Sequence, residues 1–210
     1  ERDGYTRVEG VIPHTLIERL LAALPAVSRL DLRDPSTWYT HKGVIPIHHA
    51  QPQWDIRQHP QLHEVFTELW GTEALWVTMD RVGFVPPWRT GDPGPRMHWD
   101  VDPRHGATNY QGIVYLTDAT PERAPFCTIP SIYRNLSAWL ADKPAEWSHR
   151  SADFSSLEMT PVAGRAGDLI IWNSKLPHGP GYNHSPEPRL MQAVSMFPAP
   201  RRGGGWPGTR

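Results

Sequence analysis

Residues 167–189 read GDLIIWNSKLPHGPGYNHSPEPR, and this stretch decides the fold that the sequence predicts. It begins with a Gly-Asp turn and continues as an apolar run typical of a buried strand, which leads to His178. A turn rich in Gly, Pro and Asn then lets the chain reverse before Arg189, eleven residues after His178. We therefore expect His178 and Arg189 to lie on neighbouring strands around one pocket.

A second motif lies upstream, where residues 96–100 read RMHWD. Residues i and i+2 of a strand point to the same face, so the His98 imidazole and the Asp100 carboxylate can converge on one ion, while Trp99 points to the opposite face. This pair alone is a weak signal, because the chain has 11 histidines and the spacing also arises by chance. Together with His178, however, it supplies the two histidines and one carboxylate of the facial triad of non-haem iron oxygenases.

Such a triad leaves three positions of an octahedral iron open, which suits a bidentate 2-oxo acid and O2. The far carboxylate of 2-oxoglutarate would then need a fixed cation. Arg189 fits this role, since a guanidinium offers a bidentate fork that lysine lacks.

The rest of the chain predicts a few early helices followed by short strands. Apolar residues at helical spacing predict helices over residues 13–24 and 60–70, and a shorter helix is expected around residues 131–142. Alternating or apolar runs predict strands over residues 74–85, 111–117, 126–129, 159–163, 168–172 and 190–197. The 23 prolines favour short strands joined by turns.

This order of elements favours a mainly β fold with flanking helices, a double-stranded β-helix (jelly roll, cupin-like). An immunoglobulin-type sandwich fits less well, because the two helices are early and substantial. We expect one domain over residues 1–200 and a flexible Gly-rich tail over residues 201–210.

Composition narrows the partners and the compartment. The formal net charge of −1 gives no sign of a nucleic-acid partner, and no apolar stretch is long enough to span a bilayer. The single cysteine, Cys127, cannot form an intramolecular disulfide, so we expect a cytoplasmic protein. The expected partner is a small-molecule substrate, and the sequence leaves the oligomeric state open.

The order of these motifs resembles that of the phytanoyl-CoA dioxygenase family. The similarity runs over most of the chain, through GYTRVEGVI (residues 4–12), QGIVYLTDATPERAPFCTIP (residues 111–130) and RLMQAVSMFP (residues 189–198). Carried over by position, His98, Asp100 and His178 match the catalytic iron ligands and Arg189 the co-substrate arginine. One departure is visible, since residues 130–134 read PSIYR where family members often have P-G-S-H.

The resemblance implies Fe(II) as cofactor, 2-oxoglutarate and O2 as co-substrates, and hydroxylation of a C–H bond with release of succinate and CO2. It also suggests that Gln111 looks inward and hydrogen-bonds 2-oxoglutarate. Related halogenases replace the carboxylate ligand with Gly or Ala, so Asp100 favours hydroxylation over halogenation. Desaturation, epimerisation and ring formation use the same triad and stay open.

Two other classes of protein remain as alternatives. A cupin-like isomerase that holds Mn or Zn would have no need of Arg189. A catalytically inactive binding module would keep the barrel without turnover.

Overall fold

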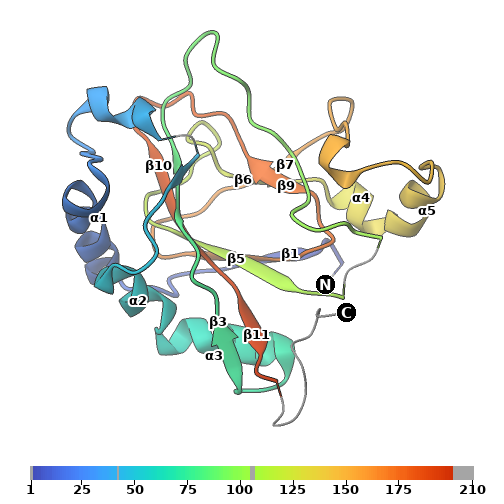
Figure 1. Ribbon diagram of the computed structural model, residues 1–210, viewed down its shortest axis with the longest axis horizontal. Helices are drawn as coiled ribbons and strands as arrows, with labels where there is room; N and C mark the ends of the chain where they lie inside the picture. Colours follow the sequence, from blue (N-terminus) through green and yellow to red (C-terminus); the bar gives the residue numbers. More distant parts are fainter. Residues whose placement is uncertain (1, 42, 105–106, 201–210) are drawn as a thin grey trace.

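The computed structural model describes residues 2–41, 43–104 and 107–200 (Figure 1). The helices are α1 (His14–Ser28), α2 (Gln51–Arg57), α3 (Pro60–Trp70), α4 (Pro130–Arg134) and α5 (Leu136–Ala141), with 3₁₀ turns η1 (Pro35–Thr40) and η2 (His149–Ser151). The strands are β1 (Tyr5–Val8), β2 (Val44–Ile45), β3 (Leu75–Val77), β4 (Val82–Val85), β5 (Tyr110–Tyr115), β6 (Phe126–Thr128), β7 (Thr160–Val162), β8 (Leu169–Asn173), β9 (His178–Pro180), β10 (Arg189–Val194) and β11 (Met196–Pro198).

Two antiparallel sheets form the body of the protein. The larger has six strands in the order β1-β8-β5-β10-β4-β2, and the smaller has three in the order β7-β6-β9. Ile113 and Ile170 of the large sheet pack in one cluster with Phe126 and Val162 of the small sheet, so the two sheets face each other. We call the space between them the barrel interior. This arrangement confirms the predicted jelly roll.

Helices α1, α2 and α3 cover the outer face of the large sheet, on the left and lower side of Figure 1. The alternation along β8 explains why this sheet is buried on both faces. Leu169 and Ile171 pack in the cluster that includes Leu20 of α1 and Phe66 of α3, whereas Ile170 points into the barrel interior. The predicted helix over residues 60–70 is α3, bounded by Pro60 at its first turn and Gly71 at its C-cap.

The outer face of the small sheet carries a second cluster, covered by α4, α5 and the segment that follows them. Trp99 lies at its centre, with its ring centroid 5.4 Å from that of Trp139 and 5.1 Å from that of Phe154. Its indole N–H donates to the main-chain oxygen of Lys175. Trp99 therefore points away from the barrel interior, as period two predicted.

Two long strand predictions were wrong, because both strands break at the same place. Residues 74–85 form two strands, β3 and β4, and residues 190–197 form β10 and β11. Strands β4 and β10 belong to the six-stranded sheet, whereas β3 and β11 pair with each other in a separate two-stranded sheet. At the break, the main-chain N–H of Thr78 donates to the carbonyl of Ser195, and the Ser195 N–H donates to the Thr78 hydroxyl. The side chain thus replaces one main-chain ladder partner and interrupts the pairing.

Smaller differences concern the helices. Helix α1 continues past residue 24 to Ser28 with Pro25 inside it, and ends at Arg29 in a left-handed conformation. The predicted helix over residues 131–142 is split into α4 and α5 at Asn135. The structure adds short elements that the sequence did not predict, among them β1, β2 and α2. The prediction that His178 and Arg189 lie on neighbouring strands was wrong, because β9 pairs with β6 in the small sheet whereas β10 pairs with β4 and β5 in the large one. Among the described helices none is long and apolar enough to cross a membrane. The predicted tail at residues 201–210 lies outside the described residues.

Candidate metal and co-substrate site

The two histidines are brought together by main-chain pairing. His98 and His178 form an isolated antiparallel bridge in which the N–H of each donates to the carbonyl of the other, at 2.9 and 3.0 Å. Residues paired in this way carry their side chains on the same face of the sheet. The two imidazole centroids lie 4.7 Å apart.

Asp100 completes the cluster from the same loop segment as His98, two residues further along the chain. Its Oδ1 lies 3.4 Å from Nε2 of His98, and its Oδ2 lies 3.4 Å from Nε2 of His178. One ligand atom from each of the three side chains lies within 4.8 Å of the other two. Among the described residues, these three form the cluster of side chains that could hold a metal ion. The structure therefore brings the three predicted ligands together, while their role as ligands stays a prediction.

Both rings are oriented for coordination through Nε2. Nδ1 of His98 lies 3.2 Å from the carbonyl oxygen of Arg96, and Nδ1 of His178 lies 3.0 Å from that of Leu176. Since a carbonyl oxygen can only accept, Nδ1 carries the proton in each ring, and the Nε2 lone pair is left for an ion.

Electrostatics show a site prepared for a cation. In the metal-free protein with both rings protonated, Nε2–H donates to Asp100, and these hydrogen bonds, first from His178 and then from His98, hold the pKa of Asp100 well below its usual range. The Asp100 carboxylate in turn raises the pKa of His98, against the opposing effect of burial. A proton and a metal ion compete for the same Nε2 lone pair, so the carboxylate that favours one also favours the other.

The side chain of Gln111 is already hydrogen-bonded to a residue of the triad in this structure. Its amide nitrogen donates to Oδ2 of Asp100 at 2.6 Å, while its Oε1 is buried without a hydrogen-bond partner. Gln111 therefore orients the carboxylate first, and contact with a co-substrate through Oε1 stays a prediction.

Aromatic rings enclose the buried side of the triad. Phe126 stacks on His178 with centroids 5.9 Å apart, and Trp172 lies 4.7 Å from the same ring. The indole nitrogen of Trp172 is buried without a partner. Sequence reasoning did not single out Trp172, although its period-two position beside Ile170 places it on the interior face.

Arg189 is a buried cation that lacks a carboxylate. Arg189 is the first residue of β10 and is only 3% exposed. Its Nε donates to the main-chain oxygen of Ala124 at 2.7 Å. Its Nη1 is buried with no partner, and in the described part of the chain no acidic side chain pairs with it. Burial lowers the pKa of the guanidinium, yet an arginine stays charged in proteins. A charge buried in this way is costly unless an anion joins it.

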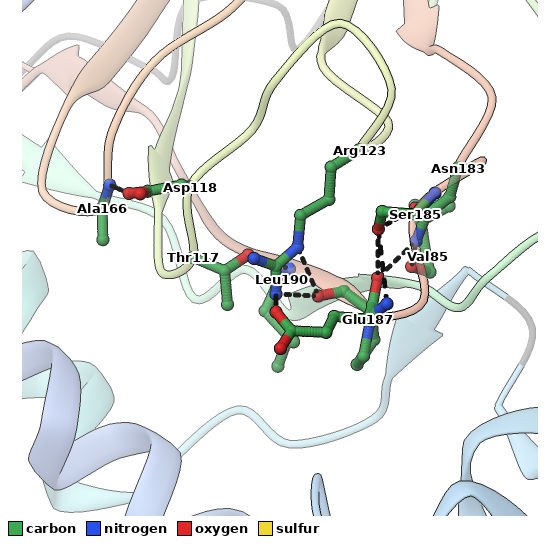
Figure 2. A network of polar contacts seen from close by, with 10 residues as sticks. Val85, Thr117, Asp118, Arg123, Ala166, Asn183, Ser185, Glu187 and Leu190 are labelled. Carbon is green, nitrogen blue, oxygen red and sulfur yellow. Dashed lines mark hydrogen bonds and ion pairs between the residues drawn. The ribbon is translucent and has the colours of Figure 1, made fainter.

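The neighbouring turn fixes the start of β10 (Figure 2). Arg123 donates to the carbonyl of Pro188, the residue before Arg189, and pairs with Glu187. Asn183 donates to the carbonyls of Val85 and Glu187, both at 2.9 Å. The guanidinium therefore extends from a braced strand end, and the predicted turn chemistry of this segment is confirmed.

The Gly-Asp pair that opens the deciding motif is structural. Gly167 has φ +98°, and a Cβ there would lie 2.6 Å from the carbonyl oxygen of Ile12, so only glycine fits. The Asp168 carboxylate accepts from the main-chain N–H groups of Gly10 and Arg165. These contacts hold the N-terminal segment against the start of β8.

A cavity of about 700 Å³ opens beside the triad, with His98 in its wall. The remaining walls come from the long loop after β4, from residues 180–183 after β9, and from Tyr39 and His41. In Figure 1 the loop after β4 rises, in green, above the sheets. The cavity gives a small molecule a route to the exposed edge of the metal cluster.

Comparison with known proteins identifies relatives of this chain. A family model described as phytanoyl-CoA dioxygenase (PhyH) matches residues 1–191. A putative phytanoyl-CoA dioxygenase of Dictyostelium discoideum is 22% identical over 259 aligned positions, which cover 94% of this chain and 73% of the relative.

Solved structures share the fold at low sequence identity. The epimerase SnoN, in complex with Fe3+, alpha-ketoglutarate and nogalamycin RO, superposes with a TM-score of 0.66 at 19% identity, covering 100% of this chain and 88% of SnoN. The carbocyclase SnoK gives 0.65 at 19% identity, covering 94% of this chain and 80% of SnoK. HygX from Streptomyces hygroscopicus, with nickel, 2-oxoglutarate and hygromycin B bound, gives 0.62 at 17% identity, covering 93% and 83%.

Proposed function

Because this chain belongs to the phytanoyl-CoA dioxygenase family, we propose that it is an Fe(II)- and 2-oxoglutarate-dependent oxygenase that hydroxylates a C–H bond of a small organic substrate. The family was predicted from the sequence, and that prediction is confirmed. Iron and 2-oxoglutarate, also predicted, agree with the family and with the fold neighbours whose structures hold them.

The observation that carries the proposal is the buried Arg189, whose Nη1 has no partner. Arg189 and the triad lie close to the same interior strand, since Arg189 donates to the carbonyl of Ala124, two residues before Phe126, whose ring stacks on His178. A 2-oxo diacid can bind a metal through one end and a guanidinium through its far carboxylate. A metal-dependent isomerase has no use for that second cation.

The donor set fits Fe(II). Two imidazole Nε2 atoms and one carboxylate form a facial triad that leaves positions open for a co-substrate. With 2-oxoglutarate and O2, bound iron would supply the oxidising power for C–H cleavage, with succinate and CO2 as co-products.

The chain's own residues orient and shield this chemistry. The carbonyls of Arg96 and Leu176 keep the Nδ1 protons of His98 and His178 in place, so Nε2 faces the ion. Gln111 holds Asp100 through its amide group. Phe126 and Trp172 exclude water from the His178 side. Retention of Asp100, rather than a smaller residue, supports hydroxylation over halogenation.

The test is an anaerobic titration with Fe(II), with and without 2-oxoglutarate. We expect a visible charge-transfer band that needs both components, and succinate formation once O2 and substrate are added. A protein that binds Mn or Zn but shows no such band would be an isomerase of the cupin type. A protein with the band but no succinate across a broad metabolite screen would be an inactive binding module.

A further inference from the structure

The cavity beside His98 carries an exposed aromatic wall. Trp88 is 39% exposed and Tyr182 is 40% exposed, although both belong to residue types that proteins usually bury. Their rings meet edge to face with centroids 5.6 Å apart, and Tyr182 also stacks on His184 at 5.4 Å. Exposed rings that line a concave surface are suited to hold a flat apolar ligand.

This wall is held in place before any ligand arrives. The main-chain N–H of Trp88 donates to the carbonyl of Asn183 at 2.7 Å, and Asn183 is itself fixed by its amide (Figure 2). On the other side, a Cβ on Gly94 would lie 2.5 Å from the Tyr182 hydroxyl oxygen, so the loop packs against the hydroxyl end of that side chain. A wall ordered in this way loses little entropy on binding.

Two arginines line the cavity, Arg89 and Arg96, and among the described residues only the first is paired with an acidic side chain. The guanidinium carbon of Arg89 lies 3.4 Å from the centroid of the Tyr39 ring, and its Nε lies 3.5 Å from Asp92. Arg96, two residues before His98, donates only to the carbonyl of Arg150, and no acidic side chain of the described residues pairs with it. The cavity therefore offers Arg96 to an anion.

From this arrangement we propose that the substrate is a small molecule with a flat apolar ring system and one anionic group. The ring lies against Trp88 and Tyr182, and the anion faces Arg96, which leaves the ring edge directed toward His98. This inference rests on the proposed function, because it concerns the substrate of that same metal site.

The test uses the full chain loaded anaerobically with Fe(II) and saturating 2-oxoglutarate, so that Arg189 is occupied. Three probes separate the two features: 2-naphthoate is flat and anionic, 2-naphthalenemethanol is flat and neutral, and cyclohexanecarboxylate is anionic without a flat ring. Affinities come from calorimetry. Broadening of the probe's NMR lines by the paramagnetic Fe(II) reports whether it lies near the metal.

We expect 2-naphthoate to bind tightest of the three and to be broadened. Trp88→Ala should weaken 2-naphthoate about tenfold and leave cyclohexanecarboxylate unchanged, since only the flat ring uses the indole. Arg96→Gln should weaken 2-naphthoate about tenfold and leave 2-naphthalenemethanol unchanged. This variant keeps the Arg96 carbonyl that orients His98. Trp76→Ala is the matched control, since Trp76 is an exposed tryptophan of β3 outside the cavity, and it should change nothing.

Two outcomes would overturn the inference while leaving the proposed function intact. Either 2-naphthoate fails to bind or to be broadened by Fe(II), or it binds equally well to Trp88→Ala and Arg96→Gln. In both cases the charge-transfer band with 2-oxoglutarate would still form. Absence of that band in the wild-type protein would instead remove the proposed function itself.

Discussion

Replacing Arg189 with methionine removes the buried cation while keeping a side chain of similar length. Truncating one partner of a buried, charge-assisted pair costs about 2–5 kcal/mol. At about 1.4 kcal/mol per tenfold, apparent 2-oxoglutarate affinity should fall roughly thirty- to several-thousand-fold. The upper part of this range is expected, because the residue is 3% exposed and water cannot replace the lost contact.

The same change should hardly lower the stability of the protein without ligands. The carbonyl of Ala124 loses its donor, which costs about 1–3 kcal/mol if it stays dry. Against this, the Arg189→Met variant no longer buries an unpaired charge, and that relief offsets the loss. Urea denaturation of the metal-free protein should therefore show a small change of either sign. A functional arginine behaves in this way, whereas one that only supports the fold would lose stability.

The assay is anaerobic 2-oxoglutarate titration of the iron-loaded variants, followed through the charge-transfer band. Arg189→Lys should recover part of the affinity, since lysine keeps the charge but not the fork. Arg134→Met, which removes an exposed arginine paired with Asp3, is the control and should bind as wild type does. If Arg189→Met bound 2-oxoglutarate as tightly as the control, Arg189 would not be the co-substrate residue.

Four further outcomes follow from the site and the fold. His178→Ala should lose stoichiometric iron, measured by metal analysis after desalting, and unchanged iron content would remove His178 from the ligand set. Asp100→Gly should bind 2-oxoglutarate weakly and form no hydroxylated product; full activity would point to another carboxylate. Because the pKa of His98 is raised, iron affinity measured by calorimetry should fall as pH drops through that raised value, and a flat profile between pH 8 and 6 would contradict this. Gly167→Ala should destabilise the protein to urea by about 2–4 kcal/mol, against about 1 kcal/mol for Gly10→Ala, whose added Cβ meets nothing; equal losses would refute the clash.

Much of the fold and the core of the site could be predicted from local spacing. Period two predicted His98 and Asp100 on one face and Trp99 on the other, and the side chains lie so, although this segment forms only an isolated bridge at His98 and no strand. The deciding stretch likewise predicted β8 and the start of β10 as strands, although not that β9 between them joins the small sheet. These features depend on residues close in sequence, so backbone geometry alone is enough to derive them.

What only the tertiary structure decided involves groups far apart in the chain. Strand breaks at Thr78 and Ser195 come from mutual hydrogen bonds across 117 positions. That Gln111 holds Asp100, and that Arg189 has no carboxylate partner, are also long-range facts. A sequence shows which donors and acceptors exist, but the free energy of a polar group depends on what surrounds it after packing. For the same reason the cavity wall of Trp88 and Tyr182, contributed by separate loops, became visible only in the folded chain.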